Sequence, residues 1–432
     1  MNFAQLSMTF ILQLLVILGT CRLAGWILTR FLGQPQVIGD MIAGIMLGPT
    51  LFGAVAPDLQ RAIFTPDTRP ILNLCAQAGI GLYMFLVGLG FRKDHFQLNV
   101  RSAVTVSLTG ILAPFLLAVL CTPLMLRLGL FGEGITGFEA SLFIGVAVSI
   151  TAFPVLARII DERGLAGTPL AALALSAGAI DDAIAWTIFA ILLACLGADP
   201  SIAVKAIAGG GLFALTMLAL GPKLLQPLNR RAESEGRVSL LLLAIILMLF
   251  GASAYAMDAV GLHSVFGGFL LGVVMPRGIL TQGIKARLEP LTLLLLVPLF
   301  FTFSGLNTRL AVVDSPALIL IALAILAGSI LTKGGACWAA ARLTGQDRPT
   351  ALAVGALMNA RGLMELLVIN IGLQRGIIGP ALFSMLVLMT IVTTIMATPA
   401  IDMIARRKLL GDMRDDDPDT IIPTPLSDAR SI

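Results

Sequence analysis

The chain has 432 residues, of which 57% are hydrophobic and only 12% are charged, whereas about a quarter of the residues in an average soluble domain are charged. So few charged side chains cannot solvate a globular protein of this length, and the high hydrophobicity also excludes a disordered chain. The composition therefore predicts an all-α polytopic membrane protein that is surrounded by the lipid bilayer and has no nucleic acid partner.

Long apolar segments divide the chain, and a helix that crosses a bilayer needs about 20 such residues. The pattern predicts about 13 transmembrane helices within a membrane domain at 1–405, followed by a short cytoplasmic tail at 406–432. In chain order, these segments lie at residues 6–29, 35–52, 69–90, 99–128, 138–160, 167–196, 202–229, 237–256, 261–276, 281–306, 315–343, 350–373 and 377–404.

Basic residues are distributed unevenly over the predicted loops. Of the 29 Lys and Arg residues, 20 follow odd-numbered segments or lie in the tail, and 6 lie at the N-terminus or after even-numbered segments. Positive charge marks the cytoplasmic side of a membrane protein. We therefore expect the N-terminus outside and the C-terminus in the cytoplasm, with the protein in the cell (inner) membrane.

Two motifs recur seven segments apart. Val37–Gly44 is similar to Val265–Gly272, and Leu82–Gly88 is similar to Leu299–Gly305. Because seven is odd, the two copies cross the membrane in opposite directions, which predicts two inverted repeats of six segments joined by a linker helix at 202–229. Such repeats are typical of secondary transporters, whose sites lie near the midplane where interrupted helices meet.

The fifth and twelfth segments, again seven apart, both contain signals that interrupt a helix. The fifth has Ser149 and Pro154 at its centre, and the twelfth has Asn359 and Gly362. Proline removes a helical hydrogen bond, and the carbonyl groups freed in this way can bind an ion. We therefore expect both segments to be discontinuous.

Some ionisable side chains lie near the middle of predicted segments, where each costs at least about 2.5–3.5 kcal/mol on insertion. They are Asp181, Asp182, Lys333, Arg361 and Glu365. Groups at this depth usually mark ion or proton pathways, and their segments must meet because each charge needs a partner away from lipid. Arg361 and Glu365 are four residues apart on one helical face, which favours a structural ion pair.

Asp181 and Asp182 point about 100° apart on a helix, so one can face Lys333 while the other faces a cavity. Adjacent carboxylates hinder each other's ionisation, which suits a site that alternates between a proton and a cation. The oxygen ligands that a monovalent cation needs could come from Asp182, the Thr151 hydroxyl and freed carbonyl groups. Lys333 either exchanges a proton in every cycle or is a permanent partner of Asp181.

Three motifs together resemble the cation:proton antiporter-2 family, most closely the branch that includes the plant cation/proton exchangers. They are Ser149-Ile-Thr151-Ala-Phe-Pro154, Ile180-Asp181-Asp182 and Asn359-Ala-Arg361-Gly362. The resemblance covers roughly residues 5–405 and implies a sodium/proton antiporter-like fold that forms a homodimer.

In each protomer, the resemblance implies a core domain with crossed discontinuous helices that moves like an elevator against a dimerisation domain. We expect the core near 69–196 and 281–404, and the dimerisation elements near 6–52 and 237–276. Potassium-efflux relatives often carry a nucleotide-binding regulatory domain after the membrane part, and we expect none in this chain.

By position, Asp182 corresponds to the ion-binding carboxylate of the family. Asp181 corresponds to the preceding residue, which pairs with a lysine in some members, and Lys333 matches that lysine. Many plant exchangers have Asn-Asp where this chain has Asp181 and Asp182. The paired aspartates are more similar to electrogenic sodium/proton members and favour two protons exchanged per cation.

We therefore expect a secondary active transporter that exchanges Na⁺ and/or K⁺ for protons and needs no cofactor besides the transported ions. One alternative is a sodium-coupled organic-anion symporter of related fold. Another is an intramembrane aspartyl protease, although that chemistry places its two aspartates on separate helices. The sequence does not decide between Na⁺ and K⁺, because both cations need oxygen ligands.

Overall fold

The computed structural model describes residues 2–90, 100–165, 168–195, 200–260, 262–309 and 313–415. Within these ranges the chain is helical, and it contains no strand beyond a single bridge between Phe131 and Ile378. In the same ranges, ten helices are long and apolar enough to cross a membrane, and three apolar helices are shorter. The all-α membrane fold is confirmed, while the number of thirteen crossings stays a prediction.

Each predicted segment contains at least one helix. The first half of the chain and the linker comprise α1 Phe3–Leu32, α2 Gln36–Leu47, α3 Phe52–Val55, α4 Pro57–Ile63, α5 Arg69–Gly90, α6 Val100–Arg127, α7 Gly137–Ser149, α8 Phe153–Glu162, α9 Pro169–Cys195 and α10 Pro200–Glu235. The second half comprises α11 Leu240–Ala259, α12 Val265–Val274, α13 Ile279–Leu291, η2 Thr292–Leu296, α14 Val297–Asn307, α15 Pro316–Ser329, η4 Ile330–Gly334, α16 Gly335–Leu343, α17 Arg348–Met358, α18 Leu363–Gln374 and α19 Pro380–Asp415. In the predicted tail at 406–432, α19 continues to Asp415, and residues 416–432 lie outside the described residues.

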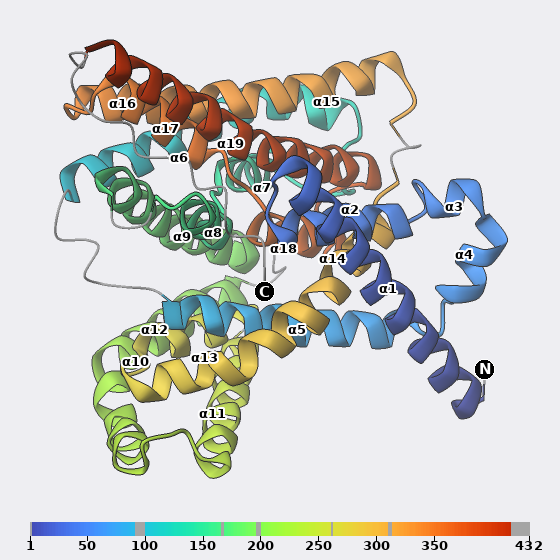
Figure 1. Cartoon of the computed structure of the whole chain (residues 1–432). Helices are drawn as coiled ribbons and strands as arrows, with labels where there is room; N and C mark the ends of the chain where they lie inside the picture. The colour runs from blue at the N-terminus through green and yellow to red at the C-terminus, as the bar shows by residue number, and fades with distance from the viewer. Residues whose placement is uncertain are drawn as a thin grey trace.

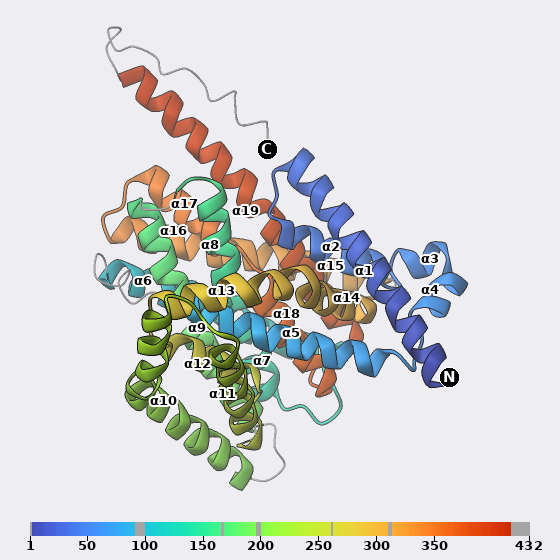
Figure 2. The same ribbon diagram turned by 60° about the horizontal axis from the view of Figure 1, so that its bottom comes forward.

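The helices pack into two groups; in Figure 1, α5 and α10–α13 of the first group lie below the second group, and α1 and α2 lie beside it. The first group consists of α1, α2, α5 and α10–α14, and the second consists of α6–α9 and α15–α19. The rotated view in Figure 2 keeps α10 and α11 apart from α16 and α17. Contacts between the groups join α9 to α10, α2 to α19 and α14 to α18.

Glycines allow the closest helix packing within the first group. A Cβ at Gly44 of α2 would collide with the backbone of α14, and one at Gly305 of α14 would collide with the Gly44 carbonyl oxygen. Gly88 of α5 and Gly272 of α12 meet in the same way. In the sequence repeat, Gly44 matches Gly272 and Gly88 matches Gly305. Helix α2 of the first repeat therefore packs on α14 of the second repeat, and α12 of the second repeat packs on α5 of the first. These two contacts are equivalent under the symmetry of an inverted repeat.

The helices pack in groups that differ from the expected division of the membrane domain, which stays a prediction. The sequence placed 69–90 and 281–306 in the core, but the corresponding helices α5 and α13–α14 pack with elements expected in the dimerisation domain. The physical reason is the glycine contact described above, which holds α5 on α12 and α14 on α2. The predicted linker at 202–229 lies within α10, which contacts α9 as well as α12 and α13.

Candidate ion-binding site

The first discontinuous helix belongs to the second group. Its leading half, α7, begins with a capping box in which Thr136 and Glu139 satisfy each other's backbone N–H groups. It ends at Ser149, and α8 begins at Phe153. Pro154 is the second residue of α8 and not the break itself, because the first turn of a helix tolerates a missing N–H group.

The second discontinuous helix follows the same plan. The side chain of Asp347 caps α17 by accepting a hydrogen bond of 3.3 Å from the Thr350 N–H group. The helix ends at Met358, and α18 begins at Leu363. Residues 359–362 therefore form the break, where the sequence predicted it.

The two breaks cross and are hydrogen bonded to each other. The Ala152 N–H group donates to the Ala360 carbonyl oxygen at 2.9 Å. The Thr151 hydroxyl donates to the Met358 carbonyl oxygen, also at 2.9 Å. These bonds satisfy polar backbone groups that the interrupted helices leave without partners, and they confirm the crossed discontinuous helices.

Lys333 extends from the π-helical turn η4 into this crossing and is fully buried. Its Nζ atom lies 3.0 Å from Asp181 Oδ2 and 3.3 Å from the Gly110 carbonyl oxygen, and it also donates to the Ser149 carbonyl. The Thr151 N–H group donates to the same Asp181 oxygen at 2.7 Å. The structure thus brings Lys333, Asp181 and the first break together, and Thr151 contacts Asp181 through its backbone.

Asp182, on the next position of α9, has a different environment. Its side chain is buried, and its carboxylate accepts a hydrogen bond from the Phe153 N–H group at the start of α8. The positive end of a helix dipole stabilises a negative charge in this position. Among the described residues, Asp182 forms no ion pair, and its Oδ1 atom has no hydrogen-bond partner.

Arg361 and Glu365 form the second buried ion pair of the crossing. The Arg361 Nη1 atom lies 3.1 Å from Glu365 Oε1, and neither side chain has exposed surface. With Lys333 and Asp181 paired as well, four of the five predicted ionisable side chains form two neutral pairs. Asp182 is the fifth, so the buried cluster carries one carboxylate more than it has basic groups to balance.

The last turn of α7 ends in carbonyl groups that have no partner within the helix. Ala147 and Val148 accept hydrogen bonds from the Arg361 guanidinium, and Ser149 accepts one from Lys333. The negative end of the α7 dipole favours these cations. These three carbonyls already accept hydrogen bonds from basic side chains, and the expectation that freed carbonyls bind an ion stays a prediction.

Sequence reasoning missed two hydroxyl side chains that hold Arg361. Ser329 accepts a hydrogen bond from the guanidinium. Thr394 accepts from the Arg361 N–H group at 3.2 Å and donates to the Arg361 carbonyl oxygen at 2.8 Å. The available signal was the run of threonines at 390, 393 and 394 inside an otherwise apolar segment, because buried hydroxyls need partners.

Asn359 and Gly362 border the second break without touching the two aspartates through a described hydrogen bond. The Asn359 side-chain nitrogen donates to the carbonyl oxygens of Gly355 at 3.2 Å and Ile330 at 3.4 Å. Gly362 precedes α18 and is extended, with φ 163° and ψ −129°. A Cβ at Gly362 would lie 2.8 Å from Val155 of α8. Asn359 thus joins the end of α17 to η4, and the missing side chain at Gly362 lets the second break approach α8.

A model of the family described as "Sodium/hydrogen exchanger, transmembrane" matches residues 17–407 of the chain. The chain belongs to this family. Sodium/hydrogen exchangers are transporters, so the protein is not an enzyme and the aspartyl protease alternative is wrong. Exchange is also favoured over the symport alternative, and the helices identify an integral membrane protein.

Curated relatives extend this result. The chain is 37% identical over 392 residues to the Na(+)/H(+) antiporter NhaS4 of Synechocystis, covering 90% of this chain and 95% of that protein. It is 34% identical to Cation/H(+) antiporter 17 of Arabidopsis thaliana and 32% identical to K(+)/H(+) antiporter 1 of Saccharomyces cerevisiae. The alignments cover 90% of this chain in both cases, but only 48% and 46% of those longer proteins.

A solved structure shares the fold of this exchanger. The sodium proton antiporter MjNhaP1 from Methanocaldococcus jannaschii superposes with a TM-score of 0.65, over 94% of this chain and 98% of the other. The sequence identity is 15%, so this likeness concerns the fold alone. It agrees with the sodium/proton antiporter-like fold that the sequence predicted.

Proposed function

We propose that this protein exchanges Na⁺ or K⁺ for protons, and that Asp182 binds the cation and the proton in turn. The observation that carries the proposal is the unpaired carboxylate of Asp182, buried beside two complete ion pairs where the discontinuous helices cross. Its excess negative charge is balanced equally well by one proton or one monovalent cation. The names of the relatives, which include Na⁺/H⁺ and K⁺/H⁺ antiporters, support the same function.

Oxygen atoms near Asp182 form the proposed ligand set. Asp182 Oδ1 and Asp181 Oδ1 are both buried and have no hydrogen-bond partner among the described residues. The Thr151 hydroxyl donates a hydrogen bond to the Met358 carbonyl oxygen, which leaves the lone pairs of the hydroxyl oxygen free to bind a cation. These are hard oxygen ligands, which suit an alkali cation.

In the proposed cycle, Asp182 loses its proton on one side of the membrane and binds the cation there. After the core changes its exposure, the cation leaves and Asp182 takes up a proton from the other side. Movement with the carboxylate ionised and empty is suppressed, because a charge without compensation is expensive to carry through the bilayer. This restriction couples the two ions.

We propose that the second helix group is the moving core, and that it slides like an elevator against the first group. This division differs from the sequence-based one in assigning α5 and α13–α14 to the static part, together with α10, which contains the predicted linker. Its support is that the discontinuous helices and all five ionisable residues lie in one group. We propose further that the first group mediates a homodimer, with the N-terminus outside and the C-terminus in the cytoplasm.

The site assignment is tested by replacing Asp182 with Asn in protein reconstituted into liposomes with a pH gradient. Asn keeps the size and a hydrogen-bond acceptor but cannot carry the charge, so we expect proton flux on addition of Na⁺, K⁺ or Li⁺ to be abolished. Asp58→Asn is the control, because Asp58 is exposed on α4. Retained cation-dependent flux in the Asp182 variant would refute the site.

The elevator motion is tested by cross-linking the two groups. The Gln34 side chain donates to the Ile395 carbonyl oxygen at 3.1 Å, across the boundary between the groups. Cysteines at these two positions, in a background without the five native cysteines, should stop exchange when oxidised and restore it when reduced. The control pair is Thr50 and Thr308, which meet within the first group. Full exchange by the oxidised Gln34/Ile395 pair would exclude the motion.

A further inference from the structure

The connection between α1 and α2 touches the second helix group through two polar contacts. Gly33 ends α1 in the left-handed conformation, with φ 59°, and its carbonyl oxygen accepts a hydrogen bond of 3.0 Å from the Arg163 guanidinium. Beside it, the Gln34 side chain donates to the Ile395 carbonyl oxygen of α19 at 3.1 Å. Both contacts cross the boundary between the groups, at the end of α1 that the charge distribution predicts to be cytoplasmic.

The Arg163 side chain is held in place by its own group. Its Nε atom lies 3.1 Å from Asp402 Oδ1 of α19, and only 25% of the Arg163 side chain is exposed. The guanidinium therefore bridges a carboxylate of the second group and the carbonyl end of α1 in the first group. The negative end of the α1 dipole favours a cation in this position, so the bridge is attractive on both sides.

Helix α8 connects this bridge to the ion site. Its first residue, Phe153, donates its N–H group to the Asp182 carboxylate, and Arg163 directly follows its last residue. The helix has ten residues, a length of about 15 Å. Because so short a helix moves as one rigid element, the contact of Arg163 with α1 also fixes the N–H group that binds Asp182.

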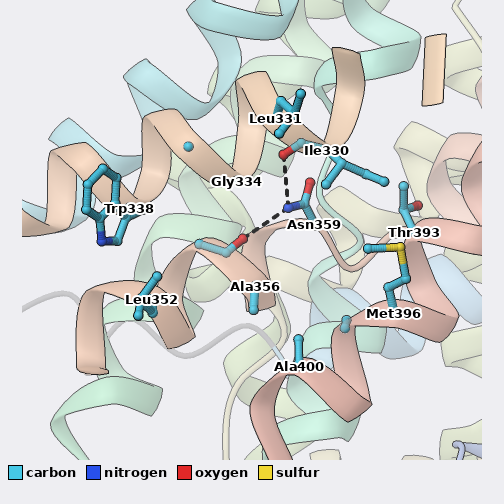
Figure 3. Close-up of a pocket in the computed structure, with 13 residues that line it drawn as sticks. Ile330, Leu331, Gly334, Trp338, Leu352, Ala356, Asn359, Thr393, Met396 and Ala400 are labelled. Carbon is cyan, nitrogen blue, oxygen red and sulfur yellow. Dashed lines mark hydrogen bonds between the residues drawn. The ribbon is translucent and has the colours of Figure 1, made fainter. Parts of the chain in front are cut away.

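Helix α19 makes a second connection to the ion site. Its Thr394 binds both the N–H group and the carbonyl oxygen of Arg361 at the second break, and the next residue is Ile395. Ile395 and Asp402 are seven residues apart and lie on one face of the helix. The other side of α19 lines the pocket next to Asn359, as Figure 3 shows, with Thr393, Met396 and Ala400. The helix thus joins both boundary contacts to the crossing.

We propose that Arg163 and Asp402, together with the contact between Gln34 and Ile395, form a latch that holds the core in the position seen here and opens in every transport cycle. The inference rests on the proposed function, because the elevator motion is what separates the two groups. A core that has moved lacks the contact with Gly33. Weakening the latch should therefore raise the share of molecules in which the groups are apart, without slowing the departure of the core from this position.

Gln34 can report the opening of the latch, because it is only 1% exposed. In lipid nanodiscs that hold the full chain with Gln34→Cys and without the five native cysteines, a water-soluble maleimide should reach the thiol only while the latch is open. We expect Arg163→Gln to speed this labelling about five-fold, the effect of losing one net hydrogen bond. The control is Arg61→Gln, which removes an exposed arginine of α4 and should leave labelling unchanged. Equal labelling with and without Arg163→Gln overturns the latch.

Transport in liposomes separates a latch from a general loss of structure. Arg163→Gln should exchange cations for protons at least as fast as wild type, because it loses a contact that the motion has to break. A variant that labels faster but has lost its flux overturns the latch, since the region around α8 is then damaged. A wild type that moves no ions instead counts against the proposed function, and labelling still decides whether Arg163 closes the boundary.

The role of Asp402 is tested by combining substitutions. Because Asp402 acts by holding the guanidinium, Asp402→Asn should speed the labelling of Gln34→Cys in the parent chain but add nothing to Arg163→Gln. Effects that add would overturn the role of Asp402 in the latch.

Discussion

The ammonium group of Lys333 lies 3.0 Å from Asp181 Oδ2, and neither side chain has any exposed surface. Removing one partner of such a pair strands the other charge in a medium of low polarity, which costs about 3–5 kcal/mol. Removing both charges avoids that cost. The pair can therefore be examined through the free energy of unfolding as well as through transport.

We expect Lys333→Met alone to lower the free energy of unfolding by about 3–5 kcal/mol, and Lys333→Met with Asp181→Asn to recover most of the loss. Unfolding of the purified protein in detergent measures both changes. Losses that simply add would contradict the pair. Transport by the double variant then addresses the open role of Lys333: exchange with the wild-type stoichiometry would show that Lys333 carries no transported proton.

The Arg361–Glu365 pair supports a second prediction. Glu365→Gln keeps an acceptor for the guanidinium but removes the balancing charge, so we expect a loss of stability of about 3–5 kcal/mol with the ion selectivity unchanged. Arg231 and Glu235 form a pair with the same spacing on the surface, at 2.9 Å. Since exposed pairs contribute little, Glu235→Gln should have no measurable effect on thermal unfolding. Equal effects of the two substitutions would refute this difference.

The glycine contact between α2 and α14 leads to a third prediction. Gly44→Ala forces a Cβ into the backbone of α14, and we expect it to destabilise the protein by about 1–3 kcal/mol. Gly19 of α1 has no atom within 4 Å of an added Cβ. Gly19→Ala should therefore be neutral or stabilise by up to about 1 kcal/mol, because alanine favours a helix. Thermal unfolding in detergent compares the two variants, and a harmless Gly44→Ala would contradict the close packing.

These contacts also show how much of the fold was accessible from the sequence. Glycine motifs seven segments apart predicted the inverted repeat, because a backbone contact in each copy leaves a glycine at the same place. The motifs did not predict that Gly44 contacts Gly305 of the other repeat. Sequence similarity shows which positions of the two repeats are equivalent, but it does not show which positions are in contact. For this reason the sequence-based division, which stays a prediction, separates α5 and α14 from the helices α12 and α2 on which they pack.

The site was predictable where charge was the signal. Asp181, Asp182, Lys333, Arg361 and Glu365 stand out because ionisable groups at bilayer depth are costly. The two ion pairs were also predicted, but the backbone and hydroxyl partners of these side chains were not. Backbone carbonyls at the end of α7 carry no sequence signature, and the π-helical turn that carries Lys333 leaves no trace in an apolar run. The hydroxyl groups that hold Arg361 did leave a signal, the threonines in an apolar segment, but that signal does not say which group they bind.

His263 lies in the connection between α11 and α12, outside both helices, and gives a prediction about pH. Burial lowers the pKa of His263 to about 4, from its ordinary value near 6.5. The side chain therefore stays neutral between pH 6 and 8, and His263→Asn should leave the pH profile of exchange unchanged. As pH falls from about 6.5 to 5, the unfolded chain binds a proton that the folded chain refuses, so wild type should lose about 1–2 kcal/mol relative to the variant.

Proton flux in liposomes and unfolding in detergent at several pH values measure these two effects of His263. A pH profile displaced by the substitution would show that His263 titrates during transport. A stability difference between wild type and variant that does not depend on pH would show that the burial of His263 does not suppress its protonation.

The adjacent carboxylates of Asp181 and Asp182 bear on the charge moved in each cycle. If both take up a proton when the cation leaves, two protons are exchanged for one monovalent cation and one net charge crosses the membrane. A potential of about 100 mV then adds about 2.3 kcal/mol to the driving force. We expect the cation gradient at which flux reverses to shift with a potential imposed across the liposome membrane. A reversal point that ignores the potential would mean that Asp181 keeps its partner Lys333 throughout and that Asp182 alone exchanges one proton for one cation.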